Sequence, residues 1–145
     1  MNGPFATAED GAQVDHVGFL VEDLAPIATL FGDLLGVEVS ELEDLPALRL
    51  QVLWVQWGPV AFEFLAPTDP GVPAADRLRR RGPGLDHIAV RVDSVAASLD
   101  WCREHDLPLL DEAPRPGAKG TMVAFLDPEA AAGTRIELVE PAADR

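Results

Sequence analysis

The chain has 145 residues, of which 48% are hydrophobic, so it can bury the core of one domain. Its formal net charge of −14 argues against a nucleic-acid partner and against binding to an acidic membrane surface. No stretch has the roughly 18 continuous apolar residues that a membrane span needs, and we expect a cytoplasmic location.

The first elements in chain order are a tail, a strand and a helix. Residues 1–13 contain small and acidic side chains but no basic segment followed by an apolar run, so we expect a flexible tail rather than a signal peptide. An apolar stretch around His16 predicts a strand. Residues 24–35 follow an acidic segment that can cap a helix, and Leu30 and Leu34 have helical spacing.

The middle of the chain predicts a hairpin, and the order of elements then repeats. Apolar residues dominate 48–57 and 60–65, and Gly58-Pro59 between them suits a turn. A second strand with an Asp-His pair follows at 85–89. A helix is predicted at 95–104, where the lone Cys102 serves as a small apolar residue, and two strands are predicted at 121–126 and 134–139.

Four residues that can bind metal recur at nearly one period. His16 and His87 are 71 residues apart, and Glu63 and Glu137 are 74 apart, which indicates a duplicated module. The paired strands of one module bury only one face, so we expect the two modules to share a core. The expected organisation is a single domain over 14–141, with module one at 14–67, a connector at 68–83 and module two at 84–141.

Each of these four residues has apolar neighbours in its strand. A carboxylate buried there is costly unless it is paired or coordinates a metal, so we expect His16, Glu63, His87 and Glu137 to bind one divalent ion. Imidazole and carboxylate donors suit Zn, Ni, Co, Mn or Fe, and the donor set does not select among them. The third histidine, His105, ends a predicted helix and is interpreted as a helix-end cation.

Basic residues are concentrated in the second half of the chain, and only Arg49 precedes position 77. For any single one of them, a solvated surface position is the simpler interpretation. Their clustering at 77–81 and 115–119 also fits a positive rim that binds an anionic group of a small-molecule substrate, because guanidinium groups match carboxylates and phosphates. The expected substrate-binding residues are Arg80, Arg81, Arg115, Lys119 and Trp54.

The duplicated pattern and its His, Glu, His, Glu set resemble the vicinal oxygen chelate superfamily of glyoxalases, extradiol dioxygenases, epimerases and bleomycin-resistance proteins. The resemblance covers 14–141, and segments 80–89, 111–120, 123–126 and 136–140 are most similar to the methylmalonyl-CoA epimerase branch. The chain departs from that branch at Asp86, where epimerases commonly have histidine, and at Glu129, where they commonly have lysine. Residues 50–53 also lack the glutamate that is a second catalytic base in some epimerases.

The resemblance implies an α+β fold in which two tandem βαβββ modules form a cleft-bearing, curved mixed sheet. It implies a metal-dependent isomerase or epimerase that moves a proton next to a carbonyl through a metal-stabilised enolate, with an acyl-CoA such as methylmalonyl-CoA as a candidate substrate. Glu63 and Glu137 are the catalytic bases in this interpretation. Family members are commonly dimers, so the resemblance also implies a homodimer.

Other classes stay open at this point. A glyoxalase-type lyase would use the same ligands, and an Fe(II) extradiol dioxygenase would use His16, His87 and Glu137 as a two-histidine, one-carboxylate triad. A metal-free protein that binds antibiotics is a third interpretation. It predicts degraded ligand positions, whereas all four ligand positions are intact here.

Overall fold

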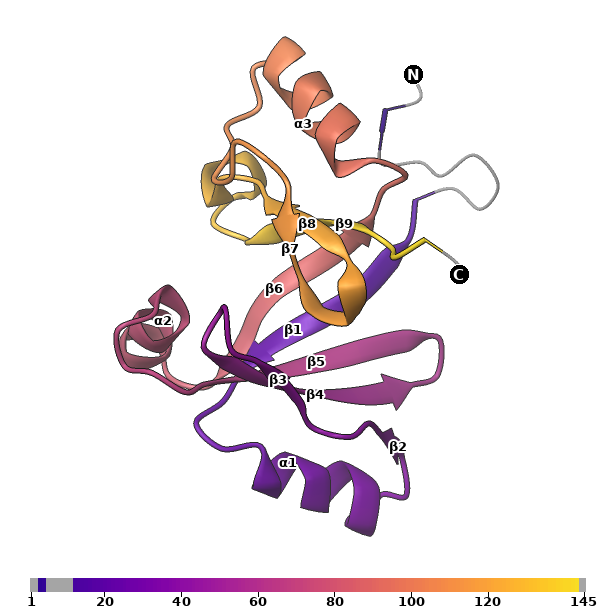
Figure 1. Cartoon of the computed structure of the whole chain (residues 1–145), viewed down its shortest axis with the longest axis vertical. Helices are drawn as coiled ribbons and strands as arrows, with labels where there is room; N and C mark the ends of the chain where they lie inside the picture. Colours follow the sequence, from indigo (N-terminus) through magenta and orange to yellow (C-terminus); the bar gives the residue numbers. More distant parts are fainter. Residues whose placement is uncertain (1–2, 5–11, 144–145) are drawn as a thin grey trace. The chain divides into compact units, whose positions relative to one another are not determined.

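The computed structural model describes residues 3–4 and 12–143, which form two compact units (Figure 1). The N-terminal unit is His16–Asp86. The C-terminal unit contains the described residues up to Asp15 together with those from His87 onward. Most of the predicted tail lies outside the described residues, and the single domain over 14–141 stays a prediction. No helix within the described ranges is long and apolar enough to cross a membrane.

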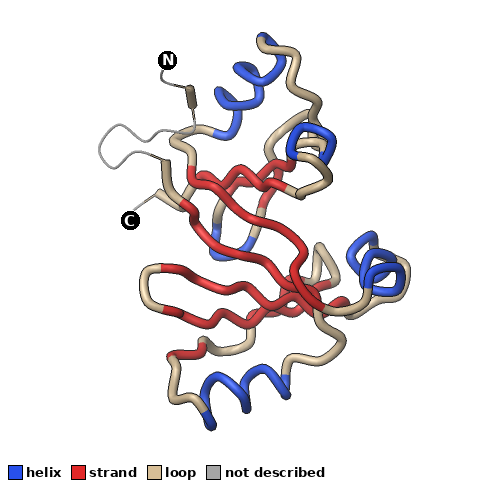
Figure 2. The backbone as a smooth tube through the Cα atoms, turned by 180° about the vertical axis from the view of Figure 1, so that it is seen from behind, coloured by secondary structure: helices blue, strands red, loops and turns tan. Residues whose placement is uncertain are grey.

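The strands of the N-terminal unit are built around the predicted hairpin. They are β1 (Val14–Leu20), β2 (Glu38–Val39), β3 (Glu43–Leu45), β4 (Leu50–Trp57) and β5 (Val60–Pro67). β4 and β5 are antiparallel, β1 lies parallel to β5, and β2 and β3 both pair with β4. Figure 2 draws the strands in red and the helices in blue. Gly58, in the turn between β4 and β5, has a φ of +61°, which glycine adopts without a steric penalty. The hairpin is therefore confirmed.

The first helix differs from the prediction in its second half. α1 (Ala25–Ala28) continues as a π-helix, η1 (Thr29–Leu34), and the N–H of Leu35 donates to the carbonyl of Leu30 at 3.0 Å. This wider turn changes which side chains face the sheet. Phe31 packs against the core, whereas Leu30 and Leu34 are exposed, Leu34 by 72%.

The connector is largely helical. α2 (Pro73–Arg81) begins with a proline, which tolerates the first helical position because its missing N–H would have no partner there. Gly82 ends the helix with a φ of +76°, and its N–H donates to the carbonyl of Leu78 at 2.9 Å. The polypeptide then enters the first strand of the second module.

The C-terminal unit repeats the strand arrangement. Its strands are β6 (Gly84–Arg91), β7 (Arg115–Pro116), β8 (Met122–Phe125) and β9 (Ile136–Glu140), and the first residues of β6 group with the N-terminal unit. β6 and β9 are parallel, whereas β8 is antiparallel to both β9 and β7. Single-turn 3₁₀ helices occur at η2 (Ala118–Gly120) and η3 (Pro128–Ala131). The mixed pairing confirms the α+β class; module one has one short strand more than the βαβββ order.

The second helix has the predicted bounds, α3 (Val95–Glu104). The hydroxyl of Ser94 accepts the N–H of Ala97 at 3.1 Å, and the carboxylate of Glu140 accepts the N–H of Val95 at 3.0 Å. These bonds satisfy N–H groups in the first turn and fasten the helix to β9. Cys102 is fully buried on its inner side, and burial raises the pKa of the thiol while Arg103 lowers it.

Side-chain alternation along the strands separates two faces of the sheet in each unit. One face is apolar and packs against the helix of its own unit. In the N-terminal unit this face includes Val55 and Phe64, and in the C-terminal unit it includes Leu138. Glu63 and Glu137 are the neighbours of Phe64 and Leu138 along the strands, so they point to the opposite face. The candidate ligands thus lie on the face away from α1 and α3.

Leu138→Ala tests the helix-packed face of the C-terminal unit. Leu138 is fully buried in the cluster that contains α3, so the truncation leaves a cavity, and we expect a loss of about 2–5 kcal/mol in the free energy of unfolding. Leu110→Ala removes the same atoms from an exposed position and should change stability by less than about 0.5 kcal/mol. Urea denaturation measures both, and equal losses would contradict this packing.

Candidate metal centre

The first pair of predicted ligands meets on the strands of the N-terminal unit. In the β1–β5 register Gly18 lies opposite Glu63, so His16 projects on the same face two residues earlier. Nε2 of His16 and Oε1 of Glu63 are 3.6 Å apart, and both side chains are buried. Trp54 lies opposite Glu63 on β4, and its ring meets the His16 ring edge-on with centroids 5.1 Å apart. The sequence predicted these three residues at the site.

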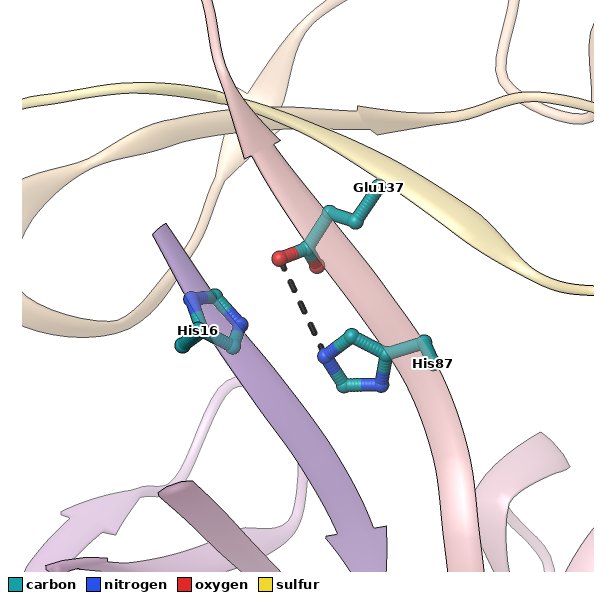
Figure 3. A group of neighbouring side chains, drawn as sticks. All are labelled: His16, His87 and Glu137. Carbon is teal, nitrogen blue, oxygen red and sulfur yellow. Dashed lines mark ion pairs between the residues drawn. The ribbon is translucent and has the colours of Figure 1, made fainter. Parts of the chain in front are cut away.

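The second pair has the same construction in the C-terminal unit. Ala89 lies opposite Glu137 in the β6–β9 register, and His87 precedes Ala89 by two residues. Nε2 of His87 and Oε1 of Glu137 are 3.9 Å apart and both residues are buried (Figure 3). Phe125 lies opposite Glu137 on β8 and meets the His87 ring edge-on at 5.5 Å. We call each of these two His–Glu–aromatic groups a half-site.

The equivalence of Phe125 and Trp54 was missed in the sequence. Trp54 precedes its glutamate by nine residues and Phe125 precedes its glutamate by twelve, because η3 lengthens the second hairpin. A fixed repeat period therefore does not align the two aromatic residues. Aligning the strands from the glutamates backwards, rather than by residue count, would have paired them.

The donors of the half-sites fit a metal ion. The Nε2–Oε1 separations exceed hydrogen-bonding range, and two ligands of one ion at about 2.1 Å would be separated by about 3.0–3.4 Å in octahedral or tetrahedral geometry. A small closure of each half-site would meet that value.

The predicted basic residues fall into two groups, one that lies beside the second half-site and one that is exposed at the surface. Arg115, on β7, places its guanidinium 5.5 Å from the centre of the Phe125 ring, and its Nε donates to the carboxylate of Asp111 at 3.3 Å. This contact connects Arg115 to the second half-site. Lys119 is exposed in η2. Arg80 forms an ion pair with the acid one turn earlier on α2.

Arg80 and Arg81 are exposed at the end of α2, unlike the buried residues of the half-sites. Arg135, which was not predicted, lies closer to the site. Its guanidinium is 4.5 Å from the centre of the Phe125 ring, and it precedes Glu137 by two residues. Residues two positions apart project from the same face of an extended segment. The spacing of Arg135 and Glu137 was therefore the available signal in the sequence.

Residues 15–125 match the family model of the Glyoxalase/Bleomycin resistance protein/Dioxygenase superfamily. The mitochondrial methylmalonyl-CoA epimerase of Homo sapiens is 32% identical over 127 residues, which cover 87% of this chain and 72% of that protein. The crystal structure of methylmalonyl-CoA epimerase from Mycobacterium tuberculosis matches with a TM-score of 0.82 and 30% identity, covering 90% of this chain and 88% of that chain.

A variant of the Streptomyces coelicolor methylmalonyl-CoA epimerase in complex with 2-nitronate-propionyl-CoA matches with a TM-score of 0.82 and 26% identity, covering 90% of this chain and 95% of that chain. The resemblance inferred from the sequence is therefore confirmed. The family match spans most of the chain, and the relatives match nearly all of it. The chain belongs to the Glyoxalase/Bleomycin resistance protein/Dioxygenase superfamily.

Proposed function

We propose that the protein is a metal-dependent isomerase of the epimerase type that acts on an acyl-CoA such as methylmalonyl-CoA. The observation that carries this proposal is the pair of equivalent half-sites, each with one buried imidazole and one buried carboxylate. The similarity to methylmalonyl-CoA epimerases supports the reaction class. A homodimer and a cytoplasmic location belong to the same proposal.

The proposed metal ligands are His16, Glu63, His87 and Glu137. A divalent ion bound by them supplies a Lewis acid that polarises the thioester carbonyl and makes the neighbouring C–H more acidic. The chain's own contribution is the buried, preorganised donor set. Trp54 and Phe125 exclude water from the histidine edges, because each ring packs against one imidazole.

The carboxylates of Glu63 and Glu137 are the proposed bases. One carboxylate oxygen accepts the α-proton, and the electron pair of the broken C–H bond moves into the enolate of the substrate. The other glutamate, from the equivalent strand of the other module, enters the step as a protonated carboxylic acid and gives its proton to the opposite face of the carbon. The proton now on the first glutamate then exchanges with water, and the second glutamate takes up a proton, which restores the starting state. The net change is inversion at that carbon with no change in composition.

The anionic parts of the substrate are the proposed ligands of the positive rim that consists of Arg80, Arg81, Arg115 and Lys119. Arg115 has the strongest structural support among them because it packs over Phe125 beside the second half-site. Its hydrogen bond to Asp111 restricts the side chain, and Asp111 itself accepts the N–H of Phe125 at 2.8 Å. A restrained guanidinium loses less conformational entropy when it binds an anion.

His87→Ala tests the metal site. The purified, reconstituted protein should bind one divalent ion, and the variant should lose most of it, as measured by elemental analysis. Because a metal bound only by the folded state stabilises that state, the parent should gain about 2.7 kcal/mol at a free metal concentration about 100 times its Kd. His105→Ala is the matched control, since His105 lies exposed at the end of α3. Absence of bound metal at any stoichiometry near one in the parent protein refutes the site.

Proton exchange tests the reaction. In deuterated water, the metal-loaded protein should introduce deuterium at the α position of methylmalonyl-CoA. Glu137→Gln and Glu63→Gln should each lower epimerisation by at least about 100-fold, because a general base contributes about 10²–10⁴-fold. Mass spectrometry measures exchange, and metal content is measured in parallel. Oxygen consumption with a catechol and Fe(II) would instead assign the protein to the dioxygenase class.

Arg115→Glu tests the positive rim. The substitution places a negative charge beside an anionic substrate, and we expect the apparent dissociation constant for methylmalonyl-CoA to rise about tenfold or more with little change in metal content. Arg103→Glu is the control, because the Arg103 and Arg115 side chains have similar exposure, 42% and 40%. Equal affinities of the two variants, measured by calorimetry at two salt concentrations, would leave Arg115 as ordinary surface charge.

A further inference from the structure

An arginine–aspartate pair lies directly beside one proposed metal ligand in the sequence. Asp86 precedes His87, and its carboxylate accepts two hydrogen bonds from Arg77, from Nε at 2.9 Å and from Nη2 at 3.4 Å. Only 4% of the Asp86 side chain is exposed. Two bonds from a planar guanidinium restrict both the distance and the orientation of the carboxylate.

The Arg77–Asp86 pair connects α2 to β6 across a segment that contains two glycines with positive φ. Gly82 and Gly84 lie between α2 and the body of β6, with φ values of +76° and +138°. Glycine adopts such values readily, so the backbone at this point has more freedom than a regular strand. The pairing of β6 with β9 begins at Ile88, after His87. The bond between Arg77 on α2 and Asp86 on β6 therefore restrains the strand on the glycine side of the histidine.

The restraint acts through the backbone of the histidine. Successive residues of a strand point to opposite faces, so Asp86 projects away from the face that carries the His87 ring. Arg77 therefore holds the adjacent peptide rather than the imidazole itself. Its role is that of a positioning residue.

The other histidine has the same kind of neighbour. Asp15 precedes His16, and one of its carboxylate oxygens accepts hydrogen bonds from Nε and Nη2 of Arg91 at 3.3 and 3.0 Å. The two arginines do not occupy equivalent positions of the repeat, because the residue 71 positions before Arg91 is Leu20. Each Asp-His pair is thus anchored by an arginine from a different element, Asp86 by Arg77 on α2 and Asp15 by Arg91 on β6. An arginine–aspartate hydrogen bond therefore occurs next to both histidines, although the two arginines come from different positions in the chain. This recurrence links the bond to the histidines.

We infer that the Arg77–Asp86 pair positions His87 for metal binding, an inference that rests on the proposed metal site. Metal affinity is sensitive to small displacements of a ligand. Loss of a group that bonds directly to a ligand typically costs about 10–100-fold in affinity, and we expect the lower end of that range here because the Arg77–Asp86 pair acts through the neighbouring peptide. Loss of the Arg77 bonds removes one restraint from the segment between Gly82 and His87. Metal binding then has to supply part of the order that this restraint gave.

The test is a Co²⁺ titration of the full chain followed by visible absorbance, which measures both affinity and coordination geometry. Arg77→Met should weaken Co²⁺ binding about tenfold and change the shape or intensity of the absorption bands. Arg77→Lys retains the charge and one hydrogen bond, and it should restore part of the affinity. Arg79→Met is the matched control on the same helix, because Arg79 is exposed and donates to the carbonyl of Pro70; its titration should equal that of the parent.

The outcomes separate this inference from the proposed function. A parent protein that does not bind Co²⁺ refutes the metal site itself. If the parent binds Co²⁺ and Arg77→Met gives the same affinity and spectrum, the metal site stands and the positioning role is refuted. Near-UV circular dichroism checks that the variants fold. If Arg77→Met does not fold, Asp86→Asn replaces it, since it keeps the shape of the side chain and removes its charge.

Discussion

Glu63 and Glu137 are carboxylates buried on sheet faces, and the arrangement of each half-site follows from that burial. A carboxylate that is removed from water needs a compensating charge or a bound ion. In both units the Nε2 atom of a histidine on the parallel neighbouring strand lies close to the carboxylate, at 3.6 Å from Glu63 and 3.9 Å from Glu137. The strand that carries each glutamate has the histidine strand on one side and an antiparallel strand on the other. An aromatic residue on that antiparallel strand packs against the histidine ring. The backbone register, rather than side-chain flexibility, therefore sets the distance between the donors.

Successive side chains of a strand point to opposite faces of the sheet, so adjacent residues have different roles. One residue packs in the core, and its neighbour is a candidate ligand. Leu138 belongs to the core beneath α3, while Glu137 beside it points to the opposite face. Phe64 and Glu63 have the same relation above α1. A substitution on the helix-packed face can therefore change the free energy of unfolding while the donor set is preserved. This division allows a duplicated module to keep its candidate ligands while its core and loops diverge.

Much of the fold, and the buried strand positions of the four candidate ligands, could be predicted because these features depend on short-range patterns. The Gly58-Pro59 turn correctly predicted the hairpin, and the helix predicted at 95–104 has the bounds of α3. The phase of the first helix could not be predicted, because a π-helical turn depends on packing around Phe31 rather than on the spacing of leucines. Arg135 was missed for a related reason, since its place over an aromatic ring depends on the register of β8 and β9.

The single cysteine gives access to motions of one unit alone. Cys102 is fully buried in the C-terminal unit, and burial raises the pKa of its thiol, so the reactive thiolate is scarce while the unit stays closed. Alkylation then requires a transient opening, and in the regime of rapid reclosing its rate measures the free energy of that opening. Trp54 and Trp57 lie in the N-terminal unit and Trp101 lies in α3 of the C-terminal unit, so tryptophan fluorescence reports both units at once. Alkylation of Cys102 therefore follows local unfolding around His87 and Glu137 without a contribution from the unit that holds His16 and Glu63.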